Sequence, residues 1–258
     1  MWGAISGPPR QQMSAPLLET RGLSKHFGGV HAVAGLDLAM AEGEVLGLIG
    51  PNGAGKTTVF NLLSGFLRPD AGAIRFRGGS LLGQSPHAIC RRGLARTFQI
   101  VRPFPRLSVL DNVMVGALAR HPAAPRARAH ARAIVERLGL GAKAAQPAAS
   151  LTLAERKRLE LARALATEPA LLLLDEVMAG LNATEIAGVV ALIREIHRGG
   201  VSILITEHNM RAVMALSHRI VVLNFGEIVA EGAPAAVANH PRVVEAYLGE
   251  EYVAAPSR

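Results

Sequence analysis

The chain has 258 residues, of which half are hydrophobic and only 4% aromatic, and its net charge is +8 with a pI of about 10.7. This length suffices for one large α/β domain or two lobes around a mostly aliphatic core. The sequence has no run of about 18 apolar residues, so we expect no helix that crosses a bilayer. Cys90 is the only cysteine, which excludes an internal disulfide and is typical of a reducing compartment.

The positive charge does not by itself indicate a nucleic-acid partner. Of the 28 basic residues four are lysines and the other 24 are arginines, and abundant Arg and Ala are typical of GC-rich coding. The densest basic stretch, Arg120–Arg137, has no aromatic side chains on which bases could stack. We therefore expect no nucleic-acid partner.

The first third of the chain has the pattern of strands around one helix. Residues 1–16 are rich in Pro and Gly, lack the layout of a secretory signal, and predict a disordered lead. The apolar patterns then predict strands at Leu17–Phe27, Val33–Met40, Glu44–Ile49 and Ala73–Arg77, with a helix at Gly55–Ser64.

The rest of the chain is first helical and then alternates. Residues 85–166 predict a helical lobe, and a helix is expected at Thr184–Arg198, between Asn182 as its cap and Gly199-Gly200. Strands are expected at Ala170–Leu174, Val201–Thr206, Ile220–Leu223 and Glu227–Glu231, with a last helix near Pro241–Leu248 and a tail at 249–258. Such alternation predicts a mainly parallel sheet flanked by helices.

A phosphate-binding loop is the most specific local motif. Gly50–Thr57 reads G-P-N-G-A-G-K-T, which matches G-x-x-x-x-G-K-[ST] between an apolar strand and a helix. The backbone N–H groups and the helix N-terminus would surround phosphates, Lys56 would supply charge and Thr57 would bind Mg²⁺. The predicted contacts are Gly50, Pro51, Asn52, Gly53, Ala54, Gly55, Lys56, Thr57 and Thr58. GTPases, kinases and helicases share this loop, so it does not name a family.

Two acids end a run of four leucines at Asp175 and Glu176. Asp175 would hold the magnesium ion, and Glu176 would orient and deprotonate the attacking water. A solvated strand end is the other interpretation, but it fits poorly after so apolar a strand. His208 follows a neighbouring strand and could reach the γ-phosphate. Gln99 and Phe27 are uninformative alone, and Phe27 could stack on adenine or fill the core.

The P-loop, Gln99, Leu151–Glu155, Leu171–Glu176 and His208 occur in the order found in ABC-type ATPases, which the chain resembles from about residue 17 to 248. The resemblance implies a P-loop NTPase fold of ABC type in a single domain at 17–248. Its parts would be a mainly parallel core, an N-terminal antiparallel β part and a helical subdomain at about 85–166. It further implies catalytic roles for Glu176, His208 and Gln99, magnesium contacts by Thr57, Gln99 and Asp175, and adenine stacking by Phe27 with Val33 nearby.

Five phrases resemble the ATPase subunits of branched-chain amino-acid importers: Leu23–Val33, Gly93–Gln99, Phe104–Val113, Ala179–Asn182 and Thr206–Met210. This finer resemblance implies ATP and Mg²⁺ as cofactors, a second, different ATPase subunit, two transmembrane permease subunits and an external solute-binding protein. The chain would sit on the cytoplasmic face of the cell membrane. Related systems carry urea or short amides, so the expected cargo is a branched-chain amino acid or a related small amide.

Three other functions share parts of this pattern. Phe98 and the run Phe27-Gly28-Gly29 favour the importer over a lipopolysaccharide-export ATPase. A soluble ABC protein not engaged in transport usually has two cassettes in one chain or a long coiled-coil insertion. The acid at Glu176 argues against a non-catalytic nucleotide-binding regulator.

The sequence departs from the family at its signature, usually Leu-Ser-Gly-Gly-Gln, which here reads Leu151-Thr152-Leu153-Ala154-Glu155. Thr152 keeps a hydroxyl, and Thr152 and Ala154 are the expected contacts to an ATP held by the partner ATPase. Both glycines are absent, and Glu155 would repel a nearby phosphate. Asn182 also stands where the family usually has Asp. The hypothesis is that the dimer has two unequal ATP sites.

Overall fold

The computed structural model describes residues 15–100 and 102–243. The predicted disordered lead at 1–16 lies almost entirely outside the described residues. The predicted tail at 249–258 and the end of the predicted helix near Pro241–Leu248 lie outside them as well.

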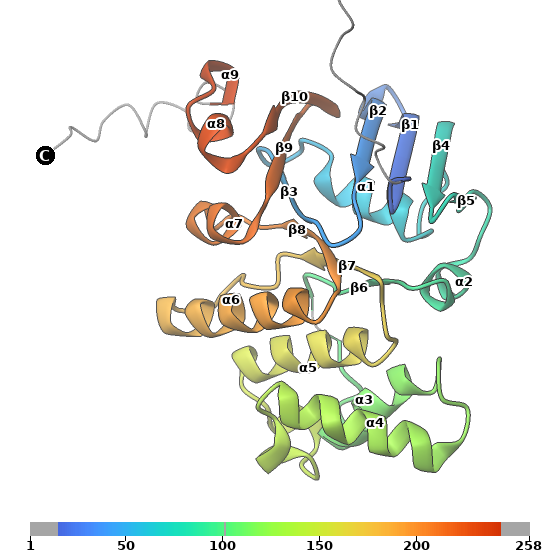
Figure 1. Ribbon diagram of the computed structural model, residues 1–258, viewed down its shortest axis with the longest axis vertical. Helices are drawn as coiled ribbons and strands as arrows, with labels where there is room; N and C mark the ends of the chain where they lie inside the picture. The colour runs from blue at the N-terminus through green and yellow to red at the C-terminus, as the bar shows by residue number, and fades with distance from the viewer. Residues whose placement is uncertain (1–14, 101, 244–258) are drawn as a thin grey trace, which may run out of the picture.

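The N-terminal part is an antiparallel sheet with the strand order β2-β1-β4-β5 (Figure 1). Its strands are β1 (Leu18–Phe27), β2 (Val30–Met40), β4 (Ala71–Phe76) and β5 (Gly79–Ser80). The turn between β1 and β2 is Gly28-Gly29, and Gly28 has a φ of 58°, a left-handed value that glycine adopts without strain. The antiparallel β part expected for residues before the helical lobe is therefore present.

The central sheet has the strand order β10-β9-β3-β8-β7-β6 and is parallel except for β10, which runs antiparallel to β9. The strands are β3 (Val45–Ile49), β6 (Leu94–Arg96), β7 (Leu171–Asp175), β8 (Ser202–Thr206), β9 (Arg219–Asn224) and β10 (Glu227–Gly232). The P-loop joins β3 to α1 (Lys56–Leu63). This arrangement confirms the expected α/β fold.

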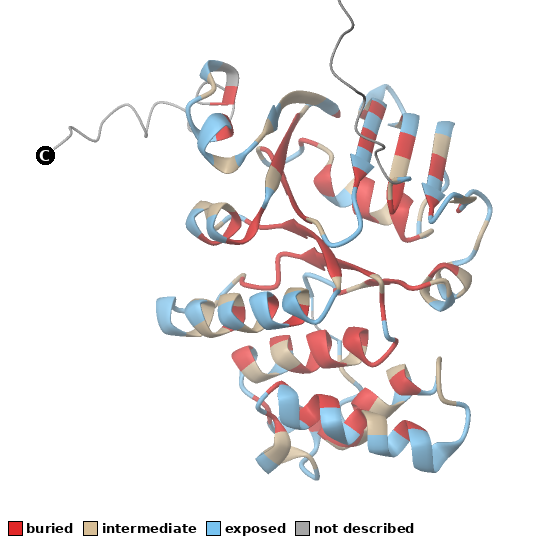
Figure 2. Cartoon of the chain, viewed as in Figure 1, coloured by how far each residue is buried: buried red, intermediate tan, exposed pale blue. Residues whose placement is uncertain are grey.

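Burial on both faces explains the leucine run of β7. Leu171 and Leu173 pack into one apolar cluster, and Leu172 and Leu174 pack into another on the opposite face. In Figure 2 the buried residues accordingly follow the central strands, and the outward faces of the flanking helices are exposed. A strand covered on both sides needs a continuous apolar run, and it holds the acids at its end in a fixed place.

Helices α3 (Val109–Ala117), α4 (Ala124–Arg137) and α5 (Leu153–Leu165) form the helical lobe at the lower end of Figure 1. Helix α2 (Pro86–Arg91) precedes them, and 3₁₀ turns occur at Gly141–Lys143 and Ala148–Ser150. The prediction of a helical pattern throughout 85–166 was wrong at β6, which pairs with β7 in the core sheet. A three-residue strand is too short to show a period of two.

The remaining helices are α6 (Ala183–Arg198), α7 (Met210–Leu216), α8 (Pro234–Ala238) and α9 (Pro241–Val243). Helix α6 begins at Asn182, whose side chain accepts a hydrogen bond from Glu185 N–H, while the Glu185 carboxylate accepts one from Asn182 N–H. It is followed by Gly199, so the predicted cap and stop are confirmed.

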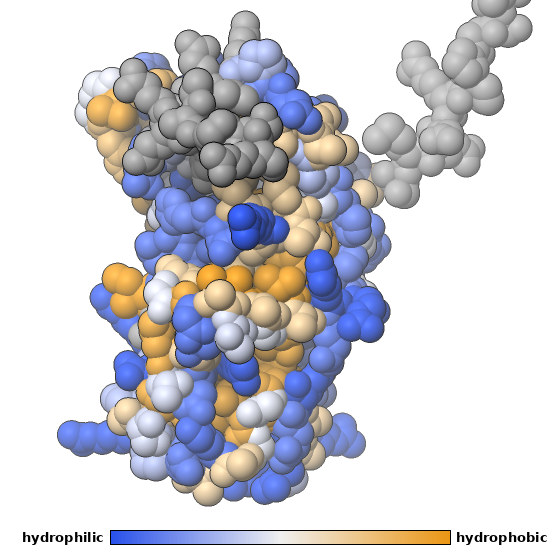
Figure 3. Space-filling model, turned by 90° about the vertical axis from the view of Figure 1, so that its left-hand side faces the viewer, coloured by the Kyte–Doolittle hydropathy of each residue, from blue (hydrophilic) through white to orange (hydrophobic). Residues whose placement is uncertain are grey.

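Within residues 15–100 and 102–243, no helix combines the length and apolar character needed to span a membrane. The side of the molecule shown in Figure 3 has apolar patches at mid-height, with hydrophilic residues above and below them.

Candidate ATP-binding and hydrolysis site

The P-loop is shaped by two glycines that lie against neighbouring backbone. A Cβ on Gly50 would lie 2.2 Å from the carbonyl oxygen of Leu223, and a Cβ on Gly55 would lie 2.2 Å from that of Ala32. Gly55 has a φ of 105° and stands directly before α1. Any side chain at either position would therefore move the loop away from β2 and β9, and with it the backbone N–H groups that phosphates need.

The Lys56 ammonium donates hydrogen bonds to the carbonyl oxygens of Gly50 (2.6 Å) and Pro51 (2.9 Å). Burial lowers the pKa of Lys56, and the charges of Glu176 and Asp175 oppose this effect. The lysine thus lies between its own loop and the two acids, where a cation can bind the phosphates of a nucleotide.

Glu176 is the centre of a polar cluster at the carboxyl ends of β7 and β8. Its Oε2 accepts a hydrogen bond from Gln99 Nε2, and its Oε1 lies 3.0 Å from His208 Nε2. The side chain of Glu176 is 11% exposed and that of His208 is 52% exposed. The structure therefore brings together the three residues that the sequence predicted as catalytic.

The backbone of Glu176 is in the left-handed region, with a φ of 48°. Residues other than glycine adopt this conformation only when their surroundings fix it. Here Glu176 N–H donates to Thr206 O (3.0 Å), and Glu176 O accepts from the Lys157 ammonium (3.1 Å). Lys157 matches no motif in the sequence, yet its ammonium also donates to Gln99 O (3.0 Å) and so links α5 to both catalytic candidates.

Asp175 forms a buried ion pair with Arg96 at 2.7 Å, and the two side chains are 4% and 6% exposed. Arg96 also donates to Asn61 Oδ1 and Ser64 Oγ. Arg96 is a second residue that the sequence analysis missed, because its contact depends on the pairing of β6 with β7. The buried guanidinium fixes the Asp175 carboxylate in place through a short, charge-assisted hydrogen bond.

The residues expected to hold magnesium fit that ion. Thr57, Gln99 and Asp175 line one hollow of about 450 Å³ between the P-loop and the helical lobe. Hydroxyl, amide and carboxylate oxygens are the donors that Mg²⁺ prefers.

The two residues expected near adenine differ in accessibility. Phe27 is 48% exposed, and Lys25 Nζ lies 5.6 Å from its ring centroid, so the ring is available for stacking. Val33 is fully buried in the apolar cluster beneath the antiparallel sheet. The expected contact of Val33 with a nucleotide is therefore not available in this conformation, because the residue exposes no surface.

In the signature segment Leu151–Glu155, two side chains form hydrogen bonds with backbone N–H groups of the same segment. Thr152 Oγ1 accepts from Glu155 N–H (3.3 Å), and Glu155 Oε2 accepts from Thr152 N–H (3.0 Å), which forms a capping box at the start of α5. Glu155 Oε1 lies 2.6 Å from Lys143 Nζ, and this hydrogen bond lowers the pKa of Glu155. The Ala154 side chain is buried, so a ligand could contact this residue mainly through its backbone at the start of the helix.

Glu207, which the sequence analysis also missed, lies next to the catalytic cluster. It is 2% exposed, and its Oε1 accepts from Met178 N–H at 2.7 Å. Burial raises the pKa of Glu207 to about 7 from the usual 4.5, and the charge of Glu176 acts in the same direction. Like Glu176, Glu207 directly follows an apolar strand, and this sequence feature could have identified it as a candidate site residue.

The raised pKa of Glu207 predicts a stability that falls with pH. Between pH 4.5 and about 7 the unfolded chain has released this proton and the folded chain retains it, so rising pH favours unfolding. Glu207→Gln should remove about 3 kcal/mol of this decline. Urea unfolding at pH 5, 6 and 7.5 should show that the free energy of unfolding of the variant rises relative to that of the wild type with each increase in pH. If the difference in free energy of unfolding between variant and wild type is the same at all three pH values, the raised pKa of Glu207 is contradicted. The control is Glu227→Gln, which changes an exposed acid and should show no such trend.

The fold and this arrangement of P-loop, acids, glutamine and histidine define a P-loop ATPase. A family model described as ABC transporter matches residues 33–179, and one described as branched-chain amino acid ATP-binding cassette transporter matches residues 227–253. The chain belongs to the ABC transporter family, as an ATP-binding cassette with ATPase activity coupled to transport.

Two curated relatives are similar over nearly the whole chain. The high-affinity branched-chain amino acid transport ATP-binding protein LivG of Salmonella typhimurium is 43% identical over 92% of this chain and all of its own length. The protein of the same description named BraF, from Pseudomonas aeruginosa, is 41% identical with the same coverage. The resemblance to the importer subfamily is thereby confirmed.

Solved structures agree with the fold. A nucleotide-free ATP-binding cassette from an ABC transporter has a TM-score of 0.83 and 29% identity, covering 91% of this chain and all of its own. The ADP conformation of an ATP-binding cassette gives the same TM-score and identity and covers 92% of this chain and all of its own.

Proposed function

We propose that this chain binds and hydrolyses ATP to power a membrane importer for branched-chain amino acids or related small amides. The observation that carries the proposal is Glu176, held by Gln99 and His208 beside the P-loop. The relatives' descriptions supply the cargo class. In a complex reconstituted with its permeases, cargo-loaded binding protein should stimulate ATP hydrolysis, and a complex that no such cargo stimulates would contradict the proposal.

In the proposed site, Glu176 accepts a proton from the attacking water and His208 holds the γ-phosphate. Lys56 and the loop N–H groups hold the β- and γ-phosphates, and Phe27 stacks on adenine. Bound Mg²⁺ would neutralise phosphate charge, with Thr57, Gln99 and Asp175 as its ligands directly or through water. Gln99 would report the state of the permease, because it stands between the lobe and Glu176.

We propose that the permeases dock at a groove of about 250 Å³ between α2, β6, α3 and α5. Phe66, Phe98 and Val115 line it and are 53%, 39% and 43% exposed. Phe66 and Phe98 form an edge-to-face pair with ring centroids 5.5 Å apart. Exposed aromatic rings beside a groove are typical of a protein interface. Docking there would place the subunit on the cytoplasmic face of the membrane. We propose that the subunit is one domain at residues 17–248, whose helical lobe at about 85–166 makes this contact.

We further propose that the second ATPase subunit is a different chain and that the two ATP sites are unequal. The site in this chain's own P-loop has its full set of residues. The site that this chain completes in its partner would still receive the N–H groups of Leu153 and Ala154 at the start of α5, but with the charge of Glu155 and without the backbone freedom of the two glycines. A carboxylate near the γ-phosphate opposes closure.

Unequal sites predict unequal effects of removing the two bases. Glu176→Gln in this subunit should abolish most ATP hydrolysis by the complex, and the equivalent change in the partner should remove a minor part. Steady-state phosphate release from each single variant measures the difference. Equal losses would contradict the proposed inequality and leave the ATPase assignment intact.

A further inference from the structure

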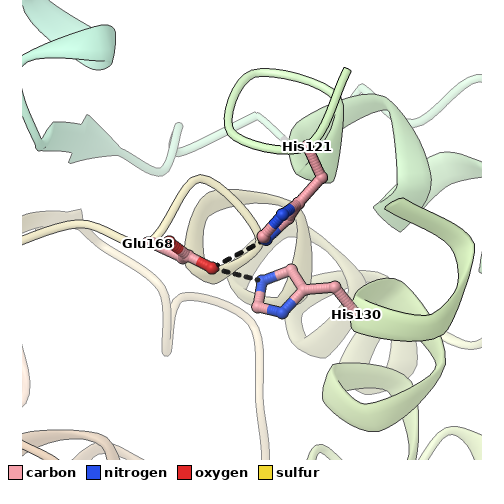
Figure 4. Close-up of side chains that lie close together, drawn as sticks. All are labelled: His121, His130 and Glu168. Carbon is pink, nitrogen blue, oxygen red and sulfur yellow. Dashed lines mark hydrogen bonds and ion pairs between the residues drawn. The ribbon is translucent and has the colours of Figure 1, made fainter. Parts of the chain in front are cut away.

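A cluster of two histidines and one glutamate lies in the helical lobe, away from the ATP site. His121 follows α3, His130 lies in α4, and Glu168 lies in the turn between α5 and β7 (Figure 4). Both imidazole rings point toward the same carboxylate oxygen. The connection after α3, helix α4 and the distant turn before β7 thus supply one ligand atom each.

The distances between the candidate ligand atoms suit a tetrahedral metal ion. His121 Nε2 lies 2.9 Å and His130 Nε2 lies 3.6 Å from Glu168 Oε1, and all three atoms lie within 4.8 Å of one another. Ligands bound to zinc at about 2.0–2.1 Å in tetrahedral geometry are roughly 3.3 Å apart. Small rotations of the side chains would bring all three atoms to that spacing.

One of the three candidate ligand atoms forms no hydrogen bond in the part of the chain that the structure describes. His130 Nε2 is buried and has no hydrogen-bond partner within residues 15–100 and 102–243. A buried polar atom without a partner costs free energy that a bound ion would recover. The His121–Glu168 contact satisfies one ring, and the carboxylate cannot bond both rings well in this arrangement.

The surroundings hold the three ligands in place and leave room for water. Arg120 Nε donates to Thr167 O (2.9 Å), which ties the end of α3 to the turn that carries Glu168. His121 N–H donates to Ala117 O, and Glu168 N–H donates to Leu165 O. The side chains of His121, His130 and Glu168 are 30%, 26% and 47% exposed, so a fourth, water ligand is accessible.

From this geometry we infer that His121, His130 and Glu168 form a binding site for a divalent transition-metal ion of the zinc class. The donor set, two imidazoles and one carboxylate with an open position, suits Zn²⁺ or Co²⁺ rather than Mg²⁺. The site lies at the amino end of β7, whereas Asp175 and Glu176 lie at its carboxyl end, about 15 Å away along a five-residue strand. Bound metal would tie the α3–α4 connection to the turn that leads into the core sheet.

The test is a titration of the full chain, without a histidine tag or nucleotide, with Co²⁺ as a spectroscopic probe. The wild type should bind one equivalent with the visible absorption of a four- or five-coordinate ion, and Zn²⁺ should displace it. His130→Gln and Glu168→Gln should each lose this equivalent and the rise in melting temperature that Zn²⁺ causes. His87→Gln, which changes an exposed histidine on α2, should retain both.

Circular dichroism before the titration establishes that each variant is folded, and His121→Gln replaces any that is not. A wild type without a saturable equivalent would overturn the inference. Retention of the equivalent with unchanged spectrum in the folded His130 and Glu168 variants would overturn it as well.

Discussion

Glu176→Gln should lower the rate of ATP hydrolysis at this chain's own P-loop by about 10²- to 10⁴-fold, because it removes the group that accepts a proton from the attacking water. Gln keeps the size of the side chain and can still contact Gln99 and His208. The left-handed backbone at position 176 depends on contacts of the main chain, which the change leaves intact. Nucleotide affinity should therefore stay within about threefold, a change of less than about 1 kcal/mol.

Phosphate release under steady-state conditions and binding of a fluorescent ATP analogue measure the two effects separately. The matched control is Glu227→Gln, which changes an exposed acid on β10 and should leave both unchanged. When the second ATPase subunit carries the equivalent change, a Glu176→Gln complex that retains a tenth or more of the wild-type rate would show that another group accepts the proton.

Arg96→Met should lower the free energy of unfolding by about 3–5 kcal/mol, because it leaves the buried Asp175 carboxylate without the guanidinium that pairs with it. The variant also loses the hydrogen bonds to Asn61 and Ser64. Chemical denaturation measures the change. Arg91→Met removes an exposed arginine of α2 and should cost less than about 0.5 kcal/mol.

The double variant Arg96→Met with Asp175→Asn separates the ion pair from the packing. Because the remaining polar group is then neutral, the double variant should be destabilised by less than the sum of the two single variants. Additive losses would mean that the two side chains are not coupled, contrary to the buried ion pair.

The sequence was most informative where strand order determines position. Glu176 and His208 each follow an apolar strand, and the carboxyl ends of neighbouring parallel strands lie together, so their proximity could be predicted. The P-loop was equally clear, because its spacing, the strand before it and the helix after it agree. Asn182 could be placed at the start of α6 because Asn is a preferred capping residue before a helical pattern.

The residues that the sequence did not reveal act through contacts that depend on register or helix rotation. Arg96 reaches Asp175 only because β6 joins the core sheet, and its three residues lie in a segment with a helical pattern. Lys157 has the pattern of an exposed charge on a basic helix, but it is buried against the carbonyl oxygens of Gln99 and Glu176. Val33 is the reverse case, because the resemblance implies a place near adenine and the structure shows its side chain buried in the core.

The most direct test of the proposed function is uptake of labelled leucine into vesicles that contain the two permeases and both ATPase subunits. ATP is trapped in the lumen with the ATPase subunits facing it, and cargo-loaded binding protein is added outside. We expect ATP-dependent accumulation of leucine that Glu176→Gln in this subunit abolishes and Glu227→Gln leaves unchanged. Accumulation at the wild-type rate with Glu176→Gln, or none with the wild-type subunits, would contradict it.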